Sequence, residues 1–112
     1  MAAARLTGAT REEHRLLHTL CTTRGVRLSP SGHSLIYKPR GVPLPRTRAH
    51  GWVLLHGITA PARVLAHILR VGPDGPLADP HPPGPHDRDP HNVHPDNWTQ
   101  WVNLEAKLES KL

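Results

Sequence analysis

The chain has 112 residues, a length that corresponds to one small domain. Its 14 Lys and Arg residues outnumber its 9 Asp and Glu residues, which gives a net charge of +5 with histidine neutral. The single cysteine excludes a disulfide framework and a four-cysteine zinc site. The sequence has no signal-peptide pattern and no apolar run of the roughly 18 to 20 residues that span a membrane. We therefore expect a cytoplasmic protein without membrane contact.

The charges are distributed unevenly along the chain. Most arginines lie within residues 1–72, whereas most acidic residues follow from Asp74 onward. A basic half beside an acidic, histidine-rich half suits an enzyme that cuts a polyanion, because basic side chains meet phosphates and acidic ones hold a cation. Ordinary surface charge in an arginine-rich protein is the alternative explanation.

The first predicted element is a helix over residues 11–23. Thr10 and Glu13 form a capping box, in which the Thr10 hydroxyl accepts the Glu13 amide and the Glu13 carboxylate reaches back. Gly25 is a plausible helix stop. Residues 1–9 are small and are expected to be flexible. One helix face is apolar, formed by Leu16, Leu17, Leu20 and Cys21.

Strand and turn signals follow over residues 26–48. Residues 34–38 predict a short strand, and residues 42–48 predict a returning edge strand that tolerates its prolines. The densest basic patch of the chain belongs to this hairpin, and it indicates either contact with a DNA backbone or a solvated surface. The patch consists of Lys38, Arg40, Arg46 and Arg48.

Two apolar segments come next. Residues 49–56 fit a helix or a strand by periodicity, and residues 57–61 break the pattern. Residues 62–71 fit a helix with Thr59 as its cap and an end at Gly72, although their β-branched content also permits a strand. Local signals favour the helix.

Eight of the thirteen prolines lie between residues 72 and 95. Such a segment forms neither a regular helix nor a central strand, so we expect a long loop that is either functional or disordered. A helical pattern resumes over 96–110, with Trp98 and Trp101 on its apolar side.

The end of this proline-rich segment gathers side chains able to bind metal or carry a proton. Hydrolysis of a phosphodiester needs a base for water, a cation for the phosphate and a group that orients the base. Imidazole and oxygen ligands together suit a divalent ion such as Mg²⁺ or Mn²⁺. The cluster consists of His86, Asp87, Asp89, His91, Asn92, His94, Asp96 and Asn97.

Four sequence segments resemble the HNH endonuclease family, particularly members encoded by phages and mobile elements. They are R-A-H at 48–50, W-V-L-L-H-G at 52–57, V-L-A-H-I at 64–68 and D-P-H-N-V-H-P-D-N-W at 89–98, and Pro61 lies between the second and the third. The resemblance covers about residues 34–106, and the last of these motifs is the most specific.

The resemblance implies a small ββα-metal (His-Me finger) core. It makes Asn92 the residue that orients the base and Asn97 a metal ligand at the start of the helix. The base is either His67, at the end of a strand, or His86, on an irregular loop. In the first case His86 joins Asp89 as a loop-borne ligand of the metal.

The expected fold is therefore α+β, a ββα-metal core with an N-terminal helix, a hairpin and a long Pro/His-rich loop, in one domain over residues 1–112. The expected function is DNA cleavage with one divalent cation, Mg²⁺ or Mn²⁺, in a host cytoplasm if the protein is phage encoded. Alternatives are a degenerate domain that only binds nucleic acid and a phage structural or assembly protein with a partner-binding arm.

Overall fold

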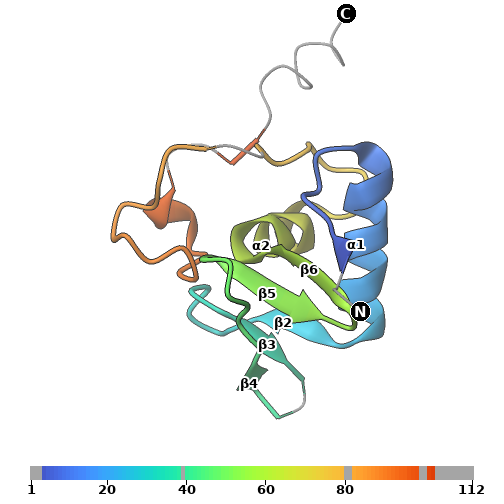
Figure 1. The fold of residues 1–112 in the computed structure, drawn as a ribbon, viewed down its shortest axis with the longest axis horizontal. Helices are drawn as coiled ribbons and strands as arrows, with labels where there is room; N and C mark the ends of the chain where they lie inside the picture. The colour runs from blue at the N-terminus through green and yellow to red at the C-terminus, as the bar shows by residue number, and fades with distance from the viewer. Residues whose placement is uncertain (1–3, 39, 80–81, 99–100, 103–112) are drawn as a thin grey trace, which may run out of the picture.

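The computed structural model describes residues 4–38, 40–79, 82–98 and 101–102 of the chain. Within these residues the chain forms a small α+β domain with two α-helices and two three-stranded sheets. The helices are α1 (Arg11–Thr23) and α2 (Ala62–Val71), and a short 3-10 helix, η1 (Pro95–Asn97), follows late in the chain (Figure 1).

The first sheet has the strand order β1-β6-β5. β5 (Trp52–Leu55) and β6 (Ile58–Pro61) form an antiparallel hairpin in which Leu55 pairs with Ile58. The two residues between them, His56 and Gly57, both have positive φ, which is the geometry of a tight two-residue hairpin turn. β1 (Ala4–Arg5) adds to β6 in parallel.

The second sheet is an antiparallel meander of β2 (Val26–Leu28), β3 (Leu35–Tyr37) and β4 (Val42–Pro43). Beyond β4 the chain turns toward the first sheet, where Arg46 makes an isolated bridge with Val53 of β5. The two sheets are therefore linked by backbone pairing as well as by the core.

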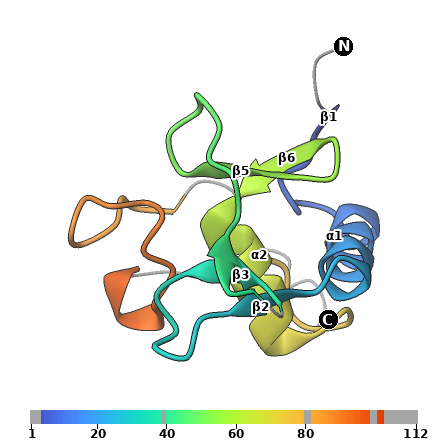
Figure 2. The same cartoon turned by 90° about the horizontal axis from the view of Figure 1, so that it is seen from below.

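α2 lies at the centre of the domain. Residues 62–68 are all buried, and Leu65, Ala66 and Ile68 are fully inaccessible. α1, β2 and β6 pack against α2, and the segment 82–98 lies on its side away from α1 (Figure 2). Burial of apolar side chains such as those of this helix is the main stabilising term for a domain of this size.

Several predicted elements are confirmed. α1 has the predicted bounds 11–23, and Thr10 caps it by accepting the Glu13 amide at 3.1 Å. The Glu13 carboxylate reaches back to the Thr7 amide, at 3.0 Å. β3 lies within the predicted strand 34–38, and 62–71 is the helix that local signals favoured, ending at Gly72.

Other expectations are corrected. Residues 57–61 were expected only to break the pattern, yet they contain β6, because the His56–Gly57 turn returns the chain at once. Thr59 is therefore a strand residue, and Pro61 precedes α2 without a capping side chain. Of the predicted edge strand 42–48, only Val42–Pro43 forms β4.

Both chain ends also differ from expectation. Residues 4–9 were expected to be flexible, but β1 pairs with β6 and Leu6 packs against the core. Gly8 lets this segment pass close to α2. Its φ is +74°, and a Cβ at this position would meet Val64 Cγ1 at 2.7 Å. The predicted helix 96–110 mostly lies outside the described residues. In its described part η1 ends at Asn97, and Ala78 and Val102 form an isolated bridge.

The Thr10 cap predicts the effect of a single substitution. Thr10→Ala should lower the free energy of unfolding by about 1 kcal/mol, because the Glu13 amide loses its acceptor. Urea denaturation measures the change. Thr19→Ala, at an exposed position within α1, is the matched control, and helix propensity predicts unchanged or slightly higher stability for it. Equal losses in the two variants would contradict the cap.

Candidate functional site

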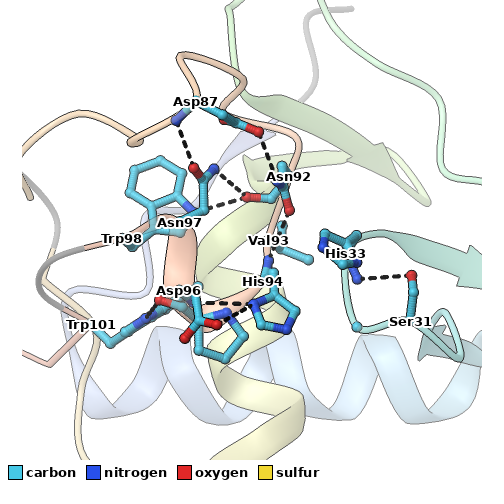
Figure 3. Close-up of polar contacts among 12 residues, drawn as sticks. Ser31, His33, Asp87, Asn92, Val93, His94, Asp96, Asn97, Trp98 and Trp101 are labelled. Carbon is cyan, nitrogen blue, oxygen red and sulfur yellow. Dashed lines mark hydrogen bonds and ion pairs between the residues drawn. The ribbon is translucent and has the colours of Figure 1, made fainter.

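The side chain of Asn97 organises the loop of residues 85–97. Its Oδ1 accepts the Asp87 amide at 2.9 Å, while its Nδ2 donates to the carbonyl oxygens of Asp89 at 3.2 Å and Asn92 at 2.9 Å (Figure 3). The His86 amide donates to the Asn97 carbonyl at 2.8 Å. With only 6% of Asn97 exposed, these bonds hold the loop against η1 without competition from water.

The Asp and Asn residues of this loop bend the backbone locally. Three side-chain oxygens accept an amide two residues further on: Asp87 from Asp89, Asp89 from His91, and Asn92 from His94, at 2.8, 3.0 and 3.2 Å. This is the usual turn chemistry of Asp and Asn, and it lets Arg88 adopt a φ of +64°.

One carboxylate is also fixed from across the loop. Asn92 Nδ2 donates to Asp87 Oδ2 at 2.7 Å. The Asn92 side chain, followed by the Asp89 amide, holds the pKa of Asp87 below its ordinary value. Asp87 is therefore a carboxylate at neutral pH, and both of its oxygens are used within the loop.

The loop is docked on the body of the domain through its C-terminal half. Val93 is fully buried, and its amide donates to the carbonyl of His33 at 2.9 Å. Arg70 of α2 donates to the carbonyls of Gly32 and Val93, at 3.1 and 2.9 Å. Near the middle of the loop, Pro90 lies so close to Gly51 that a Cβ on Gly51 would meet the Pro90 side chain at 2.8 Å.

The docked loop surrounds an open hollow, here called the Asn97 hollow. The rings of His33 and His94 stack at 4.6 Å between centroids, and His94 Nδ1 lies 3.7 Å from a carboxylate oxygen of Asp96. The Asp96 side chain is 92% exposed. Imidazole, carboxylate and amide groups thus share one water-accessible surface, which suits proton transfer or cation binding. Its lining residues are His33, His86, Asp87, Asn92, His94, Asp96 and Asn97.

His67 lies outside this hollow. It belongs to α2 and not to the strand that the HNH resemblance requires, it is only 4% exposed, and its Nε2 donates to the Pro76 carbonyl at 2.7 Å. His14 of α1 donates similarly to the Gly72 carbonyl, at 2.8 Å. Burial lowers the pKa of both imidazoles. The two histidines hold the turn that follows α2, so His67 does not occupy the place of a strand-end base.

The expected metal ligands were His86, Asp89 and Asn97. Asn97 is committed to the loop at both ends of its amide, and one Asp89 oxygen accepts the His91 amide. The described residues contain no group of three or more His, Cys, Asp or Glu side chains placed to hold a metal ion. Mg²⁺, however, is commonly held by one or two carboxylates, with water and substrate phosphate completing its shell. The exposed Asp96 carboxylate lines the hollow together with His86 and His94. This arrangement suits a cation with few protein ligands and does not form a closed metal cage.

The expected DNA-binding residues do not form one patch. Lys38 lines a hollow with His18 and Arg27, on the α1 side of the second sheet. Arg46 lies beside the loop of residues 85–97, where burial and the Arg46 charge together lower the pKa of His91. Arg40 and Arg48 are exposed in turns. Arg46 is the member of the set that the structure brings near the Asn97 loop.

Sequence reasoning missed the polar stripe of α2. Arg63, His67 and Arg70 are spaced by four and three residues and so share one helix face. The two guanidinium groups lie over the rings of Trp98 and Trp101, at 5.5 and 5.2 Å from the ring centroids. The sequence does contain a signal for this stripe, since two arginines stand at helical spacing in the most apolar segment. Arginines in a buried helix need partners, so their presence indicates that another part of the chain packs on that face.

Comparison with protein-family models, curated proteins and solved structures finds no match. Within the described residues, no helix is long and apolar enough to cross a membrane.

The role of Asn97 as loop organiser predicts a sensitivity to a nearly isosteric change. Asn97→Asp should lower the free energy of unfolding by roughly 2 to 3 kcal/mol, because a carboxylate oxygen would then face two carbonyl oxygens in a buried place. Asp96→Asn is an equally small change at a side chain of the same loop that is 92% exposed, and it should cost less than half as much. Urea denaturation compares the two, and similar losses would contradict the organising role.

The buried histidines predict how stability depends on pH. Because the folded state lowers the pKa of His67 and His14 below 6.5, the unfolded chain binds more protons as the pH falls through 6.5. Stability should therefore be complete above pH 6.5 and decrease below it, until the pH reaches the folded-state pKa values. His67→Gln should flatten this dependence in urea titrations at several pH values. A His67→Gln slope equal to that of wild type would refute the assignment.

Proposed function

We propose that this chain is an HNH-type DNA endonuclease whose reaction centre is the Asn97 hollow. The observation that supports this is the Asn97-centred loop, which holds His86, Asp87 and Asn92 around one open surface. Asn92 and Asn97 belong to the segment 89–98, whose sequence most resembles the family. The ββα-metal assignment of the core is part of the same proposal.

In this proposal His86 is the general base. It is exposed at the rim of the hollow, where water and a phosphodiester can approach it, whereas His67 is buried against the Pro76 carbonyl. A base must lie within hydrogen-bond reach of the water that it deprotonates. Asn92 acts through Asp87 and Asn97 to fix the loop, so it is a positioning residue and not a group that touches substrate.

One divalent cation, Mg²⁺ or Mn²⁺, completes the proposal, held by the Asp96 carboxylate with imidazole support from the hollow. When bound, it would neutralise charge on the phosphate and the leaving oxygen. Arg46, beside the loop, is the expected contact to the DNA backbone, with Arg48 in the same turn region. Lys38 and Arg40 would contact only DNA that extends along the β3–β4 hairpin.

Nicking of supercoiled plasmid DNA tests the proposal. Pure wild-type protein should nick in Mg²⁺ and not after chelation, and His86→Ala should lose about 100-fold or more of the rate, the usual contribution of a general base. His67→Gln should keep its activity at a temperature where circular dichroism shows it folded. His18→Ala, on α1 and away from the hollow, is the control for loss of a histidine. Absence of metal-dependent nicking by wild type would reject the proposal.

A non-catalytic nucleic-acid-binding module is the second candidate. It is favoured by the net charge of +5 and by the exposed arginines Arg40, Arg46 and Arg48, which can contact phosphates without any catalytic group. This candidate predicts DNA binding that weakens steeply with salt, as phosphate contacts do, and that survives His86→Ala. Binding without nicking, in wild type and variant alike, would favour it over the nuclease.

A further inference from the structure

A second hollow lies between the start of α2 and the segment 82–98, and it is here called the Arg63 hollow. It has a volume of about 450 Å³ and is lined by Arg63, Pro61, Trp52, Trp98 and His50, among others. This volume is within the range of pockets that hold small ligands. Among the described residues, none lines both this hollow and the Asn97 hollow.

A buried positive charge without a full set of partners lines the Arg63 hollow. Arg63 is only 5% exposed, and its buried Nη1 donates no hydrogen bond. Burial lowers the pKa of Arg63 to about 10, against the charge of Asp79, which raises it. The guanidinium is therefore charged at neutral pH. A buried donor without an acceptor is costly, and an anion that supplies the acceptor would remove that cost.

The start of α2 favours an anion at the same place. Pro61 precedes the helix and makes no side-chain capping bond, and the first turn of α2 contains no acidic residue. The Ala62 amide is used by the Gly51 carbonyl, but the amides that follow it have no capping side chain. The first-turn amides and the helix dipole attract a negative group, and both Pro61 and Arg63 line the hollow.

Two indole rings line the same hollow. The Arg5 guanidinium lies over the Trp52 ring, 4.6 Å from the ring centroid. The Arg63 guanidinium lies over the Trp98 ring, 5.5 Å from its centroid. Trp98 is also held in place by its Nε1, which donates to the Asn92 carbonyl at 3.0 Å. Proteins recognise a nucleobase joined to a phosphate by aromatic ring faces next to a positively charged group that binds the phosphate.

We propose that the Arg63 hollow binds a nucleotide, with its phosphate at Arg63 and the first turn of α2 and its base against a tryptophan ring. The phosphate would supply an acceptor for the buried Nη1 of Arg63 and a negative charge at the helix start, where the first turn has no acidic residue. An aromatic base fits the indole surfaces. A free nucleotide and the terminal nucleotide of a DNA strand present the same chemistry. The site does not depend on the proposed nuclease activity, because it shares no lining residue with the Asn97 hollow.

Amide chemical shifts and tryptophan fluorescence of the full chain test this site. The probes are inorganic phosphate, thymidine, thymidine 5′-monophosphate, and a short single-stranded oligonucleotide with and without a 5′-phosphate. The monophosphate should bind more tightly than inorganic phosphate and shift the first-turn amides of α2 saturably, and thymidine should not bind. Stronger binding of the phosphorylated oligonucleotide than of the monophosphate would identify the source as a DNA end, and the reverse would identify a free nucleotide.

Arg63→Gln should weaken binding of the monophosphate about tenfold or more, equal to roughly 1.4 kcal/mol. Arg15→Gln removes the same charge from an exposed pair with Asp74 on α1 and should leave the affinity unchanged. Unchanged affinity in a folded Arg63→Gln variant would overturn the site. If that variant does not fold, the wild type decides: saturation without any shift of the first-turn amides would overturn the site equally. A nuclease-negative protein that binds the nucleotide would reject the proposed function and leave this site intact.

Discussion

The burial of α2 is the constraint on which the rest of the structure depends. Seven consecutive residues of this helix, 62–68, are buried, so this part of the helix is covered on every side by another part of the chain. Its apolar residues are covered by α1 and both sheets. The polar residues on the remaining face cannot be covered by apolar groups alone, because buried charges and imidazoles require partners.

The chain that follows α2 supplies those partners. His67 donates to the Pro76 carbonyl, Arg70 donates to the Val93 carbonyl, and Arg63 lies over the ring of Trp98. Successive turns of one helix thus hold successive parts of a segment that has no regular strand or α-helix of its own among its described residues. The proline-rich segment is shaped by α2, and both hollows are consequences of how it is held.

The same requirement for hydrogen-bond partners explains why several expected metal ligands bond to the backbone of their own loop. A loop rich in Asp and Asn offers many oxygen atoms, and sequence alone presents all of them as possible metal ligands. In the folded chain one oxygen each of Asp87, Asp89, Asn92 and Asn97 accepts a backbone amide of the loop itself, and Asn97 is the clearest case. What remains exposed is a smaller set around Asp96 and the imidazoles. A cation bound at such a surface would need other ligands to complete its shell, whereas a structural metal site is closed by protein ligands.

The sequence by itself determined the elements whose signals are local. The capping box and apolar face of α1, the helix over 62–71 and the strand within 34–38 follow from neighbouring residues, because caps and amphipathic periods act within a few turns. Clustering of His, Asp and Asn near residue 90 also predicted a candidate site in this loop, and its functional role stays a prediction. Only the tertiary structure decided the rest. β6 depends on its pairing with β5, His67 on a carbonyl nine residues away, and Asn97 on a loop that must first dock against Arg70 and His33. These are contacts between residues whose spacing in the chain carries no periodic signal, so they are determined only when the whole core packs.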